Sequence, residues 1–242
     1  MSEQSQTTSA KKTIILVHGA WANGSSWNKV IPFLQAQNFD VTAVHLPLRS
    51  LADDAGVVKR AIAASIGEVI LVGHSWGGMV ITQAGTDEKV AALVYVAAFA
   101  PSENQSVNDL FKDYPQPEWL GGLRVDSGGF AALSPETVRD FFAPDLSAAE
   151  IEIVAATQAP LAASANDDKA TAAAWREKPS WYIVADGDRM IDPNLERALA
   201  EKLNAETTVS PTGHVAMLAA PREVAEVIIN AANYEKSSFR TA

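Results

Sequence analysis

A serine framed by glycines is the strongest chemical signal in the chain. Ser75 lies in the pattern Gly-x-Ser-x-Gly, between the apolar run 68–72 and a stretch from Met79 that is typical of a helix. A strand-to-helix turn this tight strains the serine backbone and leaves no room for side chains at Gly73 and Gly77. The serine hydroxyl then projects from the end of the strand, as a nucleophile must. A phosphate-binding loop would need a different glycine spacing, which this segment lacks.

A histidine that could activate this serine lies near the end of the chain. A serine hydroxyl is a weak nucleophile until a base removes its proton. After a turn of this kind the acid and then the histidine follow the serine along the chain, and His214 is the only histidine beyond Ser75. We expect His18 to order the loop after the first strand, and we assign no role to His45 or His74.

The acidic partner of His214 should follow the strand that precedes the histidine, and three aspartates do so. Asp192 stands in the position of a helix cap. Asp188 lies far enough into the loop to turn back toward the histidine, whereas Asp186 is placed to hydrogen-bond backbone amides of the turn. We therefore predict Asp188 as the acid. Two alternatives stay open: Asp186 and, after the fourth strand, Glu103.

Acyl transfer also needs hydrogen-bond donors for the negative charge that develops on the carbonyl oxygen. The residue after the nucleophile, Trp76, supplies one backbone N–H, and we assign the other to Ala20 in the loop after the first strand. Aromatic side chains are expected to line the substrate pocket, namely Trp21 and Trp76 from the core and Trp119, Phe130 and Phe142 from a later segment. The last three could equally pack only within that segment.

Short apolar runs separated by helical patterns must position these groups. The runs cover residues 13–17, 41–46, 68–72, 91–98, 180–185 and 207–210. Their continuous apolar character is typical of parallel strands that are covered on both faces. Helical patterns begin at Asp53 and Asp54 and again after Asp192, and a third spans 224–231. This alternation predicts a doubly wound α/β fold with a mostly parallel sheet, whose strand ends carry the ligand site.

One long segment interrupts the alternation. Residues 101–178 contain no convincing buried strand, and the stretches 114–122 and 127–135 are rich in proline or glycine. The alanine-rich stretches 147–165 and 168–175 are typical of helices. An excursion of this length is too long for a plain connection between strands, so we predict a mainly helical cap inserted into the core.

The chain is thus expected to form one α/β core with one insertion. The predicted units are a flexible tail at 1–12, a core at 13–100 and 179–234, the cap at 101–178 and a second tail at 235–242. With 242 residues, such a chain buries roughly three quarters of its unfolded surface. It therefore needs neither disulfides nor a structural metal to hold its core.

Composition narrows the function further. A net charge of −10 disfavours nucleic-acid and anionic-membrane partners. The absence of cysteine excludes thiolate nucleophiles, disulfides and cysteine-ligated metals. No apolar run has the length of a membrane span, and the polar N-terminal stretch lacks the apolar centre of a signal peptide. We expect a cytoplasmic enzyme, a monomer or homodimer, acting on a small molecule.

Four motifs resemble the methylesterase and hydroxynitrile lyase branch of the α/β-hydrolases. They are Val17-His18-Gly19-Ala20-Trp21, Gly73-His74-Ser75-Trp76-Gly77-Gly78, Asp186-Gly187-Asp188 and Gly213-His214-Val215-Ala216-Met217-Leu218. The resemblance covers 13–99 and 179–232 and implies the α/β-hydrolase fold, with Asp188 as the acid and Ala20 as the second oxyanion donor. Lyases of this branch carry threonine in place of Gly19 and lysine in place of Val215. Both absences imply ester hydrolysis rather than cyanohydrin cleavage.

These observations predict a serine hydrolase that cleaves a small carboxylic ester through an acyl-enzyme, with no metal or organic cofactor. The same triad could instead serve carbon–carbon hydrolysis, lactone opening or cofactor-free perhydrolysis. From another class, the fold could act as a small-molecule receptor with little turnover. Dehalogenase and epoxide hydrolase chemistry is disfavoured, because relatives that perform it carry an aspartate where Ser75 stands.

Overall fold

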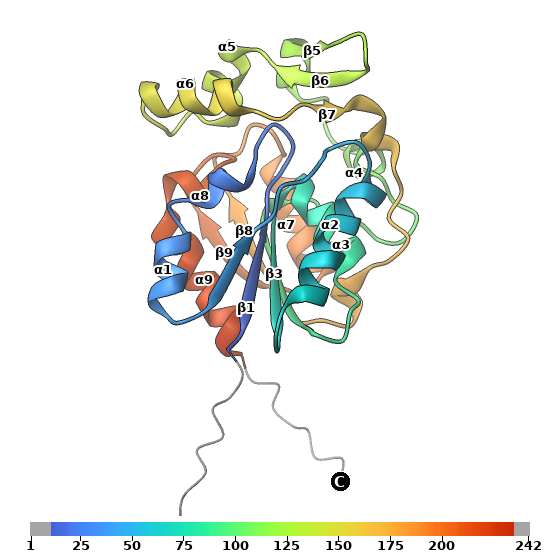
Figure 1. The fold of residues 1–242 in the computed structure, drawn as a ribbon. Coiled ribbons are helices and arrows are strands. Elements are labelled where there is room, and N and C mark those ends of the chain that lie inside the picture. The colour runs from blue at the N-terminus through green and yellow to red at the C-terminus, as the bar shows by residue number, and fades with distance from the viewer. Residues whose placement is uncertain (1–10, 235–242) are drawn as a thin grey trace, which may run out of the picture.

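A six-stranded parallel sheet forms the centre of the computed structural model, which describes residues 11–234 (Figure 1). The strands are β1 (Thr13–Val17), β2 (Asp40–Ala43), β3 (Val69–Ser75), β4 (Val90–Ala98), β8 (Ser180–Ala185) and β9 (Glu206–Ser210). Their order is β2-β1-β3-β4-β8-β9, and each neighbouring pair is parallel. The predicted doubly wound α/β fold is confirmed. The two predicted tails lie largely outside the described residues.

Helices cover both faces of this sheet. The helical elements of the core are η1 (Gly24–Trp27), α1 (Ile31–Ala36), α2 (Leu51–Ala64), α3 (Trp76–Ala84), α7 (Pro193–Lys202), α8 (Ala216–Ala219) and α9 (Pro221–Asn233). Figure 1 shows α1 and α9 on one face and α2 and α3 on the other. Strands β1, β3 and β8 are consequently buried along their whole length, which explains their unbroken apolar sequences. Within residues 11–234 no helix has both the length and the apolar character to span a bilayer.

Helix α2 begins at Leu51 rather than at Asp53. The Ser50 hydroxyl caps it by accepting a hydrogen bond from the Asp53 amide at 3.1 Å. Asp54 is fully buried, and its carboxylate accepts a hydrogen bond from the Trp76 indole at 2.7 Å. Both aspartates lie in the first turn of α2, as predicted, but the side chain of Asp54 points into the protein toward Trp76.

The residues between β4 and β8 form a long segment outside the core sheet, and we call this insertion, for which a helical cap was predicted, the cap. Its elements are α4 (Val107–Phe111), η2 (Glu118–Gly122), β5 (Leu123–Val125), β6 (Phe130–Leu133), α5 (Pro135–Thr137), a π-turn η3 (Val138–Phe142), α6 (Ala148–Thr157), β7 (Leu161–Ala162), η4 (Ala163–Asp167) and η5 (Ala174–Arg176). Figure 1 shows the elements from β5 to β7 over one end of the core sheet. The last part of the insertion lies against the core instead, since η5 contacts α3.

The cap contains a small sheet that the sequence analysis did not predict. Strands β5, β6 and β7 pair in antiparallel fashion. Asp126 sets the hairpin turn, because its carboxylate accepts hydrogen bonds from the amides of Gly128 and Phe130. Gly129 in the same turn has a φ of 81°, which glycine adopts without strain. The patch at 127–135 thus contains the turn and the second strand, β6, of a hairpin.

The expectation of helix across the alanine-rich stretches was too broad. Helix α6 ends at Thr157, and Pro160 lies just beyond it. Residues 168–175 contain only the start of the short turn η5. Helix α6 buries no side chain fully, and Ile151, Val154 and Ala155 pack against the core while partly exposed. This short apolar stripe does not mark where the helix ends. Alanine content alone does not locate a helix boundary.

Candidate active site

Ser75 ends β3 and stands directly before α3 in a strained backbone conformation. Its φ is 53° and its ψ is −120°, a region that side-chain-bearing residues rarely adopt. A Cβ on Gly77 would lie 2.5 Å from the Val17 carbonyl oxygen, and one on Gly73 would lie 2.6 Å from the Gly77 carbonyl oxygen. Both glycines are therefore required by close packing. The turn holds the serine at the carboxyl end of the sheet.

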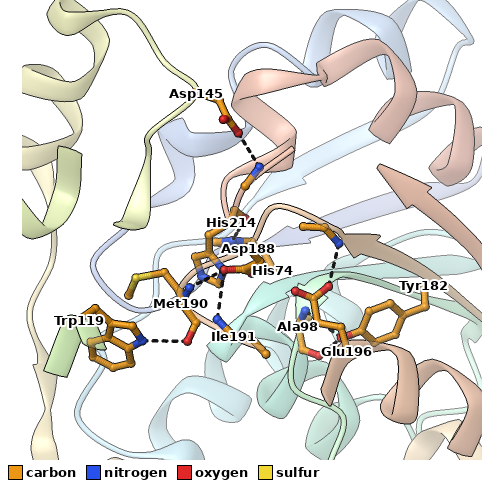
Figure 2. Close-up of polar contacts among 12 residues, drawn as sticks. His74, Ala98, Trp119, Asp145, Tyr182, Asp188, Met190, Ile191, Glu196 and His214 are labelled. Atoms are coloured by element: carbon orange, nitrogen blue, oxygen red, sulfur yellow. Dashed lines mark hydrogen bonds and ion pairs between the residues drawn. The ribbon is translucent and has the colours of Figure 1, made fainter. Parts of the chain in front are cut away.

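His214 and Asp188 form a buried pair at the same end of the sheet (Figure 2). His214 Nδ1 and Asp188 Oδ2 are 2.6 Å apart, and both side chains are almost completely buried. The other carboxylate oxygen of Asp188 accepts hydrogen bonds from the amides of Met190, at 2.6 Å, and Ile191, at 3.1 Å. Three hydrogen bonds thus fix the carboxylate and direct Nε2 of the imidazole away from it.

The structure separates the three aspartates of this loop and the alternative glutamate. Asp186 is exposed and pairs with Arg197 of α7. Asp192 caps α7, as predicted, by accepting a hydrogen bond from the Asn194 amide at 2.8 Å. Glu103 is exposed. Of these four carboxylates, only that of Asp188 is bonded to His214.

His74, which received no role from the sequence, contacts His214. Its Nε2 lies 2.9 Å from the backbone carbonyl oxygen of His214, and the two ring centroids are 4.6 Å apart. Complete burial lowers the pKa of His74 well below its usual value. A neutral ring with its proton on Nε2 therefore donates to that carbonyl, and His74 supports the backbone from which His214 projects.

Two backbone amides are available beside Ser75. Trp76 is the first residue of α3, where amides have no partner within the helix. Ala20 lies in the loop after β1 and lines the same pocket as Ser75. His18 orders this loop, because its Nδ1 lies 2.8 Å from the Gly19 carbonyl oxygen and its Nε2 accepts the Leu46 amide at 3.0 Å. Burial lowers the pKa of His18 to about 4, so the ring stays neutral.

Asp54 holds the side chain of Trp76 behind this amide. The burial of Asp54 raises its pKa to about 6, although the indole hydrogen bond opposes the rise. The indole of Trp76 is also nearly fully buried. The turn at Ser75 is therefore stabilised by Asp54 of α2 as well as by the close packing of Gly73 and Gly77.

A pocket lies over Ser75 and His214. Its lining includes Trp21, Trp76 and Trp119. Trp21 and Trp119 meet edge to face with ring centroids 5.3 Å apart. Each indole is also anchored across the boundary between core and cap. Trp21 donates to the Ala131 carbonyl at 2.8 Å, and Trp119 donates to the Met190 carbonyl at 2.8 Å.

Two predicted pocket residues lie elsewhere. On β6 the buried residues are Ala131 and Leu133, so Phe130 faces the opposite side of this strand and does not line the pocket. Phe142 packs against the His214 ring with a centroid separation of 5.4 Å. It lines a neighbouring cavity between η1 and α6 rather than the pocket over Ser75.

The sequence profile of the alpha/beta hydrolase family matches residues 14–227. The chain belongs to this family. The protein is a hydrolase, and the branch indicated by its motifs is confirmed by its relatives.

The relatives of this hydrolase include plant esterases. Salicylic acid-binding protein 2 of Nicotiana tabacum is 28% identical over 258 residues, which cover 92% of this chain and 97% of the relative. Methylesterase 1 of Arabidopsis thaliana is 25% identical over 272 residues, which cover 96% of this chain and 99% of the relative. Among solved structures, polyneuridine aldehyde esterase has a TM-score of 0.80 at 21% identity, with 92% of this chain and 100% of that chain covered. This structural likeness shows the shared fold.

Other pocket residues of the hydrolase were missed in the sequence analysis. Phe99, Met190 and Ile191 line the pocket. Their positions were informative, because Phe99 follows the end of β4 and the other two lie two and three residues after the predicted acid, Asp188. Val107 and Phe111 come from α4, and no motif identified them. Their contribution depends on how the insertion folds back over the sheet.

The pocket over Ser75 is small and adjoins a larger one. Its cavity has a volume of about 30 Å³, whereas the neighbouring cavity has about 290 Å³. Val107, Phe111, Trp119 and Asn166 line both.

Among residues 11–234, no group of three or more histidine and carboxylate side chains is arranged to hold a metal ion. The groups gathered at the pocket over Ser75 are the Asp188–His214 pair and the loop and helix start that carry Ala20 and Trp76.

Proposed function

We propose that this hydrolase is a serine carboxylesterase in which Ser75 is the nucleophile, His214 the general base and Asp188 the acid that orients it. The observation that carries the proposal is the buried Asp188–His214 pair at the pocket that also contains the strained Ser75. The backbone amides of Ala20 and Trp76 are the proposed donors to the oxyanion.

The proposed reaction has two acyl-transfer steps. His214 Nε2 takes the proton of the Ser75 hydroxyl while its oxygen attacks the ester carbonyl carbon, and the oxyanion accepts hydrogen bonds from the two amides. The bond to the alcohol oxygen then breaks, and the alcohol leaves with the proton from His214. Water, deprotonated by the same histidine, attacks the acyl-enzyme, and the carboxylic acid leaves Ser75 as the proton returns to its oxygen.

Ester hydrolysis is supported over the other reactions of this branch by two positions and by the relatives. Gly19 and Val215 stand where the related lyases carry threonine and lysine. A Cβ at Gly19 would lie 2.7 Å from the Ser75 Cβ, so a larger residue there would displace the serine. The names of two relatives, Methylesterase 1 and Esterase PIR7B, point to the same reaction class.

The two cavities also restrict the shape of the ester. A volume of about 30 Å³ beside Ser75 accepts a group little larger than a water molecule, whereas the adjoining cavity of about 290 Å³ accepts a larger group. The lining of this larger cavity mixes apolar side chains with polar ones such as Asn108, Lys112 and Gln116. We therefore propose an ester that is small on one side of the carboxyl group and larger on the other. Esters that are bulky on both sides should be poor substrates.

Hydrolysis of p-nitrophenyl acetate, butyrate and octanoate by the wild type and by Ser75→Ala tests the mechanism. We expect turnover in the wild type and a loss of at least about 10³-fold in kcat in the variant. Methyl esters of long acids, acetates of long alcohols and esters bulky on both sides then test the proposed shape. Full activity in Ser75→Ala would contradict the mechanism.

Labelling with a serine-reactive phosphonate distinguishes an esterase that does not accept these test esters from a small-molecule receptor. If neither protein hydrolyses these esters, labelling of the wild type but not of Ser75→Ala would still support a competent nucleophile with a selective cap. Tight ligand binding together with absence of labelling would instead favour a receptor.

A further inference from the structure

A second carboxyl group lies behind the catalytic aspartate. Glu196 belongs to α7 and is fully buried. Its Oε2 accepts a hydrogen bond from the Ala185 amide at 2.9 Å, and the carbonyl of Ala185 accepts the Asp188 amide at 3.0 Å. Figure 2 shows Glu196 beside Asp188 and Tyr182. Glu196 is therefore hydrogen-bonded to the last residue of β8, and the loop that contains Asp188 begins directly after that residue.

The other oxygen of Glu196 needs a partner. Oε1 is buried and has no hydrogen-bond partner among the described residues. Burying an unpaired oxygen of an ionised carboxylate costs free energy of folding, whereas a protonated oxygen can donate a hydrogen bond to a neighbouring acceptor. Burial and then the neighbouring charge of Asp188 raise the pKa of Glu196 well above its usual value. A neutral Glu196 carries the one proton that its orphaned oxygen can offer.

Asp188 has an acceptor site to receive this proton. A carboxylate offers about four lone-pair sites, and three are occupied, by His214, Met190 and Ile191. The Tyr182 hydroxyl does not compete, because it donates to the Ala98 carbonyl at 2.5 Å. Arg197, next to Glu196 on α7, pairs with Asp186 at the surface. The charged or titratable groups facing Glu196 are thus Asp188, Tyr182 and, farther out, Arg197.

We propose that Glu196 is a positioning residue for the catalytic pair: as a neutral acid it donates a hydrogen bond to the free acceptor site of Asp188 and holds that carboxylate against His214. The inference rests on the proposed function, since it takes Asp188 and His214 as the reacting pair. Glu196 touches neither the substrate nor Ser75 and acts only through Asp188.

Glu196→Gln and Glu196→Leu, with Glu201→Gln on the exposed side of the same helix as the control, test this role. The first readout is the titration midpoint of the His214 ring resonances in histidine-labelled protein, which needs no substrate. Glutamine keeps a neutral N–H donor and an acceptor, so we expect its midpoint within about 0.3 pH unit of the wild type. Leucine removes the donor and leaves the Asp188 charge less offset, so the midpoint should move to higher pH.

Steady-state kinetics supply the second readout. Glu196→Gln should keep kcat within about threefold, whereas Glu196→Leu should lower kcat about 10- to 100-fold with KM little changed, as losses of a group that orients a reacting residue do. Should Glu196→Leu not fold, Glu196→Met takes its place. Glu201→Gln should leave both readouts unchanged.

Two results would overturn the proposal. A midpoint that falls by about one pH unit in Glu196→Gln would mean that a negative charge had been removed, so that Glu196 was ionised. A folded Glu196→Leu with unchanged midpoint and kcat would leave Glu196 a packing role only. Failure of the esterase proposal is distinguishable, because it appears in Ser75→Ala, while the His214 titration reports on Glu196 without any turnover.

Discussion

The rim of the core sheet and the cap meet across one pocket, yet they are built in different ways. On the core side, Ser75 ends the fully buried strand β3, and Asp188 and His214 lie in the loops after β8 and β9. On the cap side, α6 has no fully buried residue, and Val125 and Ile153 are mostly exposed. A rigid sheet can hold reacting atoms to a fraction of an ångström, whereas a thin, exposed layer can vary with little cost to folding.

The two regions are nevertheless joined at two loops of the pocket. The Trp21 amide donates to the Ala159 carbonyl of the cap at 3.1 Å, next to the proposed oxyanion donor Ala20. Asp145 of the cap accepts the amide of Gly213, the residue before the proposed general base His214, at 2.5 Å. The comparison indicates that the core provides the proposed reacting groups, and that the cap completes the pocket and holds two of the core loops beside it.

The largest effect should come from the core side, at the aspartate. Asp188→Asn preserves size but favours the wrong tautomer of His214, so we expect kcat to fall about 10⁴-fold. Asp186→Asn is the matched control, because Asp186 lies two positions away and pairs with Arg197 at the surface. Its kcat should stay within about twofold of the wild type. Equal losses in both variants would mean that the loop, rather than the charge of Asp188, matters.

Lowering the pH should lower the free energy of unfolding through His18, in the loop after β1. The native pKa of about 4 lies below the ordinary value of 6.5, so between these values the unfolded chain binds the proton and stability falls as the pH falls. Urea unfolding at pH 7 and pH 5 should show a contribution of about 2 kcal/mol from this residue. Between pH 7 and pH 5, His18→Asn should lose about that much less free energy of unfolding than the wild type. Asp54 opposes the trend with its raised pKa, equally in both proteins, so the difference between them isolates His18.

Substitutions on the cap side should change the preference for ester chain length more than the overall rate of hydrolysis. Trp119 lines both the small cavity and the large one, so Trp119→Ala should raise kcat/KM for octanoate relative to acetate by about tenfold. Trp119→Phe, which keeps a ring, should change this ratio less. A ratio that does not move in Trp119→Ala would show that the cap does not define the pocket.

The contact between the two regions should have the smallest effect. Asp145→Ala removes the acceptor for the Gly213 amide, and we expect kcat to fall about fivefold because the loop of His214 loses one anchor. Asp140→Ala provides the comparison, since Asp140 is exposed and pairs with its neighbour Arg139. If both variants behave like the wild type, the cap does not restrain the histidine loop.

The sequence by itself determined much of the core and nominated the central residues of the site. Continuous apolar runs predict buried parallel strands from local composition alone, and Gly73 and Gly77 identify a turn that only glycine fits. Ser75 and His214 follow from that turn and from chain order. Asp188 was favoured over Asp186 by loop reach, and the structure brings Asp188 to His214.

Tertiary structure decided the rest, because the remaining contacts join residues far apart in the chain. Phe130 and Ala131 are neighbours on β6, yet only the pairing of that strand determines that Ala131 meets Trp21 and that Phe130 does not line the pocket. Asp54 and Glu196 look like ordinary helix residues until the packing of α2 and α7 buries them behind the site. Such roles arise from desolvation and shared hydrogen bonds, which the folded arrangement creates and no local pattern encodes.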